Sequence, residues 1–192
     1  MLVAIFAIVG QPVRAQTTAY AAGQGAVNSI EVGVEVRASV TGRCGFATSG
    51  APSGTIDQAD FDVNGFSRDF AIQLNCTGAS RIAVSSLNGG MASQAAGGLG
   101  YQTKAPYRVA LYMVADNGTN ASATCDAATL SAGGSCSFAG TATAAQGLRL
   151  AGASTKVNGS YLRVSAPAYT GSDTLVSGRY ADTLSVTVSV SP

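Results

Sequence analysis

Apolar residues alternate with polar residues along two segments, one near each end of the chain. Residues 29–40 place apolar side chains at every second position, namely Ile30, Val32, Val34 and Val36. Residues 183–190 repeat this spacing with Leu184, Val186, Val188 and Val190. A period of two is the side-chain period of a β-strand that turns one face toward a core. Both segments therefore predict strands, and the other face of the first one carries Glu31, Glu35 and Arg37.

The sequence between these segments favours short strands separated by turns. The whole chain is rich in glycine, with 24 in 192 residues, and only 11% of its residues are charged. Further strands are predicted at Gly54–Phe61, Arg68–Cys76, Arg81–Leu87, Tyr107–Ala115, Gly147–Leu150 and Ser160–Ala166. Seven or eight short strands with turn residues between them predict a single all-β domain built as a β-sandwich.

The first residues indicate export. Leu2–Gly10 is an apolar run, and Val13-Arg14-Ala15 precedes a candidate cleavage point before Gln16, so residues 1–15 are predicted to be a signal peptide. No Lys or Arg lies before the apolar run, which indicates that the leader is truncated at its start. The alternative is a buried N-terminal strand, because short apolar runs are common in both settings.

Four cysteines, Cys44, Cys76, Cys125 and Cys136, fit an exported protein that contains disulfides. Four cysteines permit three pairings. We favour Cys44 with Cys76 and Cys125 with Cys136, because the second pair encloses a short stretch whose Gly133-Gly134 supplies a turn. The rival is a zinc site, but the chain has no Cys-x-x-Cys pair.

The charge and residue content argue against several function classes. The net charge is +1 with the basic residues scattered singly, so the chain lacks the electrostatic footprint of a nucleic-acid-binding protein. Histidine is absent, which excludes every His-based catalytic triad or metal site. We expect no enzymatic activity, no small-molecule substrate, no cofactor and no metal.

One motif resembles the opening of a calcium-binding loop. Residues 60–65, DFDVNG, match the first half of an EF-hand loop, but the twelfth position is Ala71 where a bidentate glutamate is required. We therefore predict a β-turn that uses Asn64-Gly65.

Several of these residues together resemble a known family. A first cysteine just after an alternating N-terminal strand, a second cysteine that closes a strand as LNCTG, and a final GRYADTLSVTVSV are similar to the spore coat protein U domain family. Members of that family include subunits of archaic (Csu-type) chaperone-usher pili. The similarity spans Ser29 to the end of the chain.

The resemblance implies an immunoglobulin-like β-sandwich, residues 41–192, that is incomplete because it lacks its last strand and is completed by a donor strand. Residues 16–40 would be an N-terminal extension that donates Ile30, Val32, Val34 and Val36 to the groove of another subunit. The acceptor groove would be formed by Leu184, Val186, Val188 and Val190. Partners would be a periplasmic chaperone, an outer-membrane usher and other copies of the chain, joined head to tail in a filament at the cell surface.

The function implied is that of a structural pilus subunit, exported through the periplasm, which supports adhesion or biofilm formation. Two alternatives stay open. The N-terminal strand can complete its own domain, which would give a monomeric secreted coat protein, or the chain can be a minor or tip adhesin that acts as a binding module.

Overall fold

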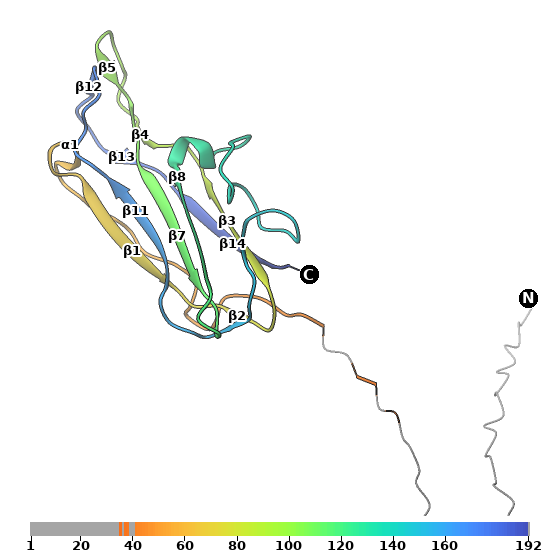
Figure 1. The fold of residues 1–192 in the computed structure, drawn as a ribbon. Helices are drawn as coiled ribbons and strands as arrows, with labels where there is room; N and C mark the ends of the chain where they lie inside the picture. The colour runs from red at the N-terminus through yellow and green to blue at the C-terminus, as the bar shows by residue number, and fades with distance from the viewer. Residues whose placement is uncertain (1–34, 36, 39–40, 192) are drawn as a thin grey trace, which may run out of the picture. The chain divides into compact units, whose positions relative to one another are not determined.

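The computed structural model describes residues 35, 37–38 and 41–191, and Val40–Pro192 forms one compact unit. The regular secondary structure of this unit is almost entirely β, as the sequence predicts (Figure 1). Its two short helical elements among the described residues are α1 (Phe61–Asn64) and the 3₁₀ helix η1 (Ala127–Leu130). No helix within the described residues is long and apolar enough to cross a membrane.

The largest sheet has four antiparallel strands. Their order is β1 (Phe66–Ile72), β11 (Ser160–Ala166), β7 (Arg108–Val114) and β8 (Asn120–Asp126). β7 and β8 form a hairpin around Asn117-Gly118, where Ala115 N–H donates to Thr119 O at 2.8 Å. β1 and β8 are therefore the two edges of this sheet.

A three-stranded sheet consists of β14 (Leu184–Val190), β3 (Ser80–Ser86) and β9 (Leu148–Leu150), in that order. β14 pairs with β3 along its whole length, from Leu184 opposite Ser86 to Val190 opposite Ser80. Two of the remaining sheets are short pairs, β10 (Ser154–Thr155) with β2 (Asn75–Cys76) and β12 (Thr174–Leu175) with β5 (Tyr101–Gln102). The last sheet has three short strands in the order β13 (Tyr180–Ala181), β4 (Met91–Ser93) and β6 (Lys104–Ala105).

One hydrophobic core is shared by the two larger sheets. The central strands β7 and β11 alternate between buried and less buried residues, as the period of two requires, and β3 does so except at Ala83, which is also buried. Their inward side chains are Ile82, Val84, Val109, Leu111, Met113, Leu162 and Val164. Phe138, which lies outside the strands, is the largest fully buried side chain and fills the same core.

The strands predicted from the sequence differ from the structure at several places. Gly54–Phe61 is not a strand: residues 54–60 pair with no strand among the described residues, and Phe61 begins α1. The predicted strand Arg68–Cys76 is divided into β1 and β2, and Leu74 between them forms an isolated bridge with Phe46. β8 was not predicted, since its inward residues are the small side chains of Ala121, Ala123 and Cys125.

The DFDVNG motif forms a helical turn, α1, and not the predicted β-turn. Gly65 ends it with φ 62°, and its N–H donates to Phe61 O at 2.8 Å. A side chain at Gly65 would collide with the backbone of Ala166, so glycine is required here by space as well as by conformation.

Candidate functional site

An open groove lies between β1 of the four-stranded sheet and β14 of the three-stranded sheet. Its volume is about 1030 Å³. Phe66 and Phe70 line it from β1, and Leu184 and Val186 line it from β14. A third wall is residues 52–60, which connect the beginning of the domain to α1.

Among the described residues, no backbone group pairs with the edge of β14 that borders the groove. Leu87 N–H donates to Thr183 O, and Ser191 N–H donates to Ala79 O, so the odd-numbered residues of β14 direct their backbone groups toward β3. The even-numbered residues direct theirs to the free edge of the sheet. These are the same four residues, Leu184, Val186, Val188 and Val190, that form the apolar face of the strand.

The apolar side chains at the groove are incompletely covered. Val84 and Ile82 on the neighbouring β3 are both 0% exposed, whereas Leu184, Val186 and Val188 are only partly buried although they pack against the core. On the opposite wall, Phe66 and Phe70 are also partly buried. The groove therefore presents apolar side chains and free backbone groups together, which is what an added β-strand can bind.

A half-buried carboxylate fixes the beginning of β14 at one end of the groove. Asp182 accepts hydrogen bonds from Ser86 Oγ at 2.6 Å and from Tyr107 Oη at 2.7 Å. Its two oxygens also accept from three backbone N–H groups, those of Asn88 at 3.0 Å, Gly90 at 3.3 Å and Thr183 at 2.7 Å. One side chain thus ties β14 to the end of β3 and to the beginning of β7.

The electrostatics of this network follow from its geometry. Burial alone would raise the pKa of Asp182, but the hydrogen bonds from Ser86, Tyr107 and the backbone lower it below the usual 3.8. Burial, and then the hydrogen bond to Asp182, raises the pKa of Tyr107 above its ordinary value of 10.0. The carboxylate is therefore charged and the phenol neutral at physiological pH, and both act as structural hydrogen-bonding groups.

The structure brings two of the four predicted acceptor residues to the groove. Leu184 and Val186 line it, whereas Val188 packs against the core beyond its end. Val190 is 39% exposed and lies beside Gly42 at the other end of β14. The predicted donor residues Ile30, Val32, Val34 and Val36 lie outside the described residues.

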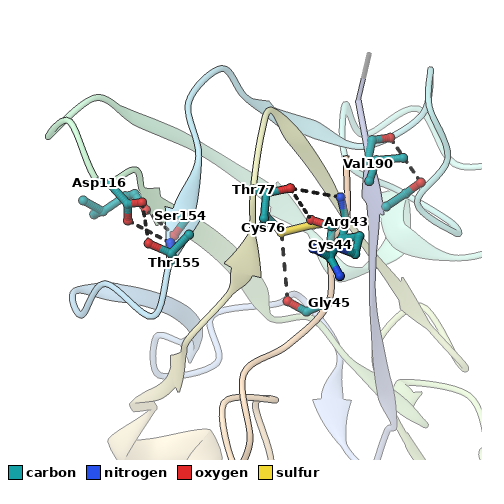
Figure 2. Close-up of a disulfide and its surroundings, with 11 residues drawn as sticks. Arg43, Cys44, Gly45, Cys76, Thr77, Asp116, Ser154, Thr155 and Val190 are labelled. Atoms are coloured by element: carbon teal, nitrogen blue, oxygen red, sulfur yellow. Dashed lines mark hydrogen bonds between the residues drawn. A yellow bond between two sulfur atoms is a disulfide. The ribbon is translucent and has the colours of Figure 1, made fainter. Parts of the chain in front are cut away.

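Both disulfides have the pairing that the sequence favours. Cys44 is bonded to Cys76, and Cys125 to Cys136. Beside the first, Arg43 N–H donates to Thr77 Oγ1 at 3.1 Å and Thr77 N–H donates to Arg43 O at 2.9 Å, which binds the beginning of the domain to β2 (Figure 2). Two disulfides and no free cysteine fit an exported protein or another oxidising environment.

Three groups of groove residues were not predicted as site residues. Phe66 and Phe70 carry only the general signal of apolar residues in a strand, and Ile56 lies in a segment that was predicted as a strand without a functional role. Asp182 is visible in the sequence within GRYADT, but its partners Ser86 and Tyr107 lie 96 and 75 positions away. Within the part of the chain that the structure describes, no three His, Cys, Asp or Glu side chains gather as metal ligands would.

The chain matches no family model, and no curated protein or solved structure was found to be similar to it.

Proposed function

We propose that this chain is a structural subunit of a surface pilus, of the kind assembled by chaperone and usher through donor-strand exchange. In this proposal the domain is an immunoglobulin-like sandwich that lacks its last strand, and the groove between β1 and β14 receives that strand from another subunit. The proposal extends the likeness to the spore coat protein U domain.

The observation that carries the proposal is that both the apolar side chains and the edge backbone groups of β14 are exposed. Leu184 and Val186 present partly covered side chains to the groove, and the same residues direct unpaired N–H and C=O groups to the free edge. An exposed edge of this length is an aggregation hazard unless something covers it. A strand added at this edge would satisfy the backbone and complete the core in one step.

The sequence supplies a segment of suitable pattern in residues 29–40. Its four apolar side chains at spacing two, Ile30, Val32, Val34 and Val36, match the even-numbered apolar residues of β14. Burial of four such side chains is worth about 6–12 kcal/mol before the entropic cost of association. Donation from one copy to the next does not close on itself and therefore generates a filament.

The test is the mass of the purified mature protein on a denaturing gel without boiling, compared with a variant that lacks residues 16–37. We expect a ladder of bands that collapses on heating and is absent from the truncated form. A matched pair of point variants refines the test: Val34→Asp alters the apolar face of the segment, and Glu35→Gln alters its polar face. We expect Val34→Asp to remove the ladder and Glu35→Gln to preserve it.

A single monomer band from the stable full-length protein would contradict the filament and favour the self-complemented coat protein. The tip-adhesin alternative is supported by a different observation. Near β5 and β12, Leu99 is 103% exposed and Tyr101 is 54% exposed, so this end of the domain presents apolar side chains to solvent. A Leu99→Ser variant that assembles normally but no longer adheres would favour that alternative.

A further inference from the structure

Asparagine is followed directly by glycine at four places in the chain. In this dipeptide the backbone nitrogen of the glycine can attack the side-chain amide of the asparagine, because glycine has no side chain to hinder the approach. The attack requires the glycine N–H to give up its proton, so a hydrogen bond that holds this N–H slows the reaction. The four pairs are Asn64-Gly65, Asn88-Gly89, Asn117-Gly118 and Asn158-Gly159.

Three of the four glycine N–H groups are held by a hydrogen bond within their own turn. These bonds run from Gly65 to Phe61 O at 2.8 Å, from Gly118 to Ala115 O at 2.9 Å, and from Gly89 to Ser86 Oγ at 2.8 Å. In each of these turns the group that would act as the nucleophile is therefore already engaged.

The turn at Asn158-Gly159 differs from the other three. Among the described residues, no acceptor is hydrogen-bonded to Gly159 N–H. Both residues of the pair are exposed and lie directly before β11, and Gly159 has φ 104°, a conformation that favours glycine. This pair thus combines a free nucleophile with an accessible side-chain amide.

A glutamine from another part of the chain polarises that amide. Gln73 Nε2 donates to Asn158 Oδ1 at 3.0 Å and to Lys156 O at 3.0 Å. A donor at Oδ1 stabilises the negative charge that develops on this oxygen when Cγ is attacked. Because Gln73 directly follows β1, the fold and not the local sequence supplies this donor.

We propose that Asn158 is a covalent modification site, at which the folded protein converts this asparagine through a succinimide to aspartate and isoaspartate. Gly159 N bonds to Asn158 Cγ, the Cγ–Nδ2 bond breaks, and Nδ2 leaves as ammonia with the proton that Gly159 N gives up. Water then adds to one of the two ring carbonyls. Cleavage of the new N–Cγ bond gives aspartate, and cleavage of the bond between Gly159 N and the main-chain carbonyl carbon gives isoaspartate.

The products change the turn in two ways. Both place a negative charge directly before β11, and isoaspartate also lengthens the main chain next to Ser160, whose Oγ accepts from Val114 N–H at 2.9 Å. Because water is the only other reactant, the modified fraction grows with the age of the molecule. The reaction needs only one folded copy of the chain, so it is independent of the proposed function.

Timed incubation of the purified full-length protein at neutral pH, followed by reduction, trypsin digestion and mass spectrometry, measures the conversion at each pair. Cleavage after Lys and Arg places the four pairs in separate peptides, 44–68, 82–104, 109–149 and 157–163. We expect Asn158 to convert about threefold to tenfold faster than Asn117, the factor that one backbone hydrogen bond is worth.

Asn117 is the matched internal control. Its following residues, Gly118 and Thr119, nearly repeat the Gly-Ser that follows Asn158, and its Oδ1 also accepts hydrogen bonds, from Thr119 N–H at 3.0 Å and Thr119 Oγ1 at 2.8 Å. The two sites therefore differ in whether the glycine N–H is held. In denaturing urea, with the disulfides reduced, the two rates should become similar.

Equal native rates, or faster conversion at Asn117, would overturn the inference. A rate difference that persisted unchanged in urea would overturn it as well, because the difference would then come from the local sequence.

A pair of glutamine variants tests the part played by the donor. Gln73→Leu should slow conversion at Asn158 about threefold or more and leave Asn117 unchanged, because one hydrogen bond to the reacting carbonyl is lost. Gln102→Leu is the control, since Gln102 donates to Asp173 at 2.8 Å and has no hydrogen bond to either asparagine. An unchanged or faster rate at Asn158 in Gln73→Leu would overturn the role assigned to Gln73.

Discussion

Two stacked sheets have two lateral sides, and in this protein the chain covers one of them and leaves the other partly open. On one side, β8 and β9 are joined through residues 127–147, which carry one half of the Cys125–Cys136 disulfide and the fully buried Leu130 and Phe138. Val84 N–H of β3 donates to Phe138 O at 2.8 Å, so this segment also satisfies the backbone of the second sheet. On the other side, between β1 and β14, the groove is lined by side chains that the chain covers only in part.

The closed side shows that this domain is large enough to cover its core along one edge. The exposed groove on the other side is therefore not a consequence of a small core. The closed side uses small inward residues on β8 and one large aromatic, Phe138, inserted from a loop. The open side has the larger strand residues, Phe70 and Leu184 among them, and the loop residue that packs there, Ile56, is only partly buried. The segment after β8 covers the core on the closed side. On the other side, partly exposed apolar side chains remain together at the groove, as they do at surfaces that bind other molecules.

The two sides should differ most in the unfolding free energy that is lost when an aromatic residue is replaced by alanine. Phe138→Ala leaves a cavity in the fully buried core and should cost about 3–5 kcal/mol of unfolding free energy. Phe70→Ala removes a ring that is partly exposed in the monomer and should cost about 1–2 kcal/mol. Urea unfolding of the monomeric fraction measures both, and equal losses would contradict the contrast between the sides.

The disulfides allow a second comparison, with somewhat smaller effects. Cys44 and Cys76 are 32 positions apart, and Cys125 and Cys136 are 11 apart. Because the unfolded chain loses more entropy when a longer loop is closed, replacing the first pair by serine should cost about 3–4 kcal/mol and the second about 2–3 kcal/mol.

Thermal unfolding of the two double-serine variants, each compared with the oxidised wild type, checks the order. If loss of the Cys125–Cys136 bond proved the more damaging, the closed side would depend on that bond for its native packing and not only for restriction of the unfolded chain.

The sequence predicts the two sides unequally. The alternation of Leu184, Val186, Val188 and Val190 places β14 correctly, because a period of two is a local signal. β8 escapes prediction because Ala, Ser and Thr residues provide no strong alternation. The segment at Gly54–Phe61 has a strand pattern but no partner, and pairing depends on residues that the local pattern does not contain.

The same limit applies to the site. The apolar residues of β14 can be named from the sequence, but the groove is also bounded by Phe66, Phe70 and Ile56, which reach it only through the order of strands in two sheets. Asp182 stands in a recognisable motif, yet its role depends on Tyr107, which arrives from the beginning of β7. Long-range contacts of this kind follow from topology and not from spacing.

The smallest of the expected effects concerns how the open side keeps β14 in place without a covering strand. Asp182→Asn should cost about 1–2 kcal/mol, because the charged acceptor of several hydrogen bonds is replaced by a weaker, partly mismatched one in a site that is only partly buried. The pKa of Asp182 is lower in the folded protein than its ordinary 3.8, so its charge stabilises the fold above that pH. This contribution is lost as the pH falls below 3.8 through the folded-state pKa. Urea midpoints measured between pH 7 and pH 2 should therefore fall less steeply at the acid end in the variant than in the wild type.

Tyr107→Phe is the matched control, because it removes one donor to Asp182 and keeps the aromatic ring in the core. We expect it to retain part of the acid dependence, since Ser86 and the backbone N–H groups still bind the carboxylate. At the alkaline end the sign reverses: the raised pKa of Tyr107 favours the folded state up to about pH 10 and is lost above it, and the phenylalanine variant lacks this dependence. If Asp182→Asn and the wild type lost stability in parallel between pH 4 and pH 2, another carboxylate would be responsible for the loss of stability in acid. The position of β14 at the open side would then depend on its pairing with β3 alone.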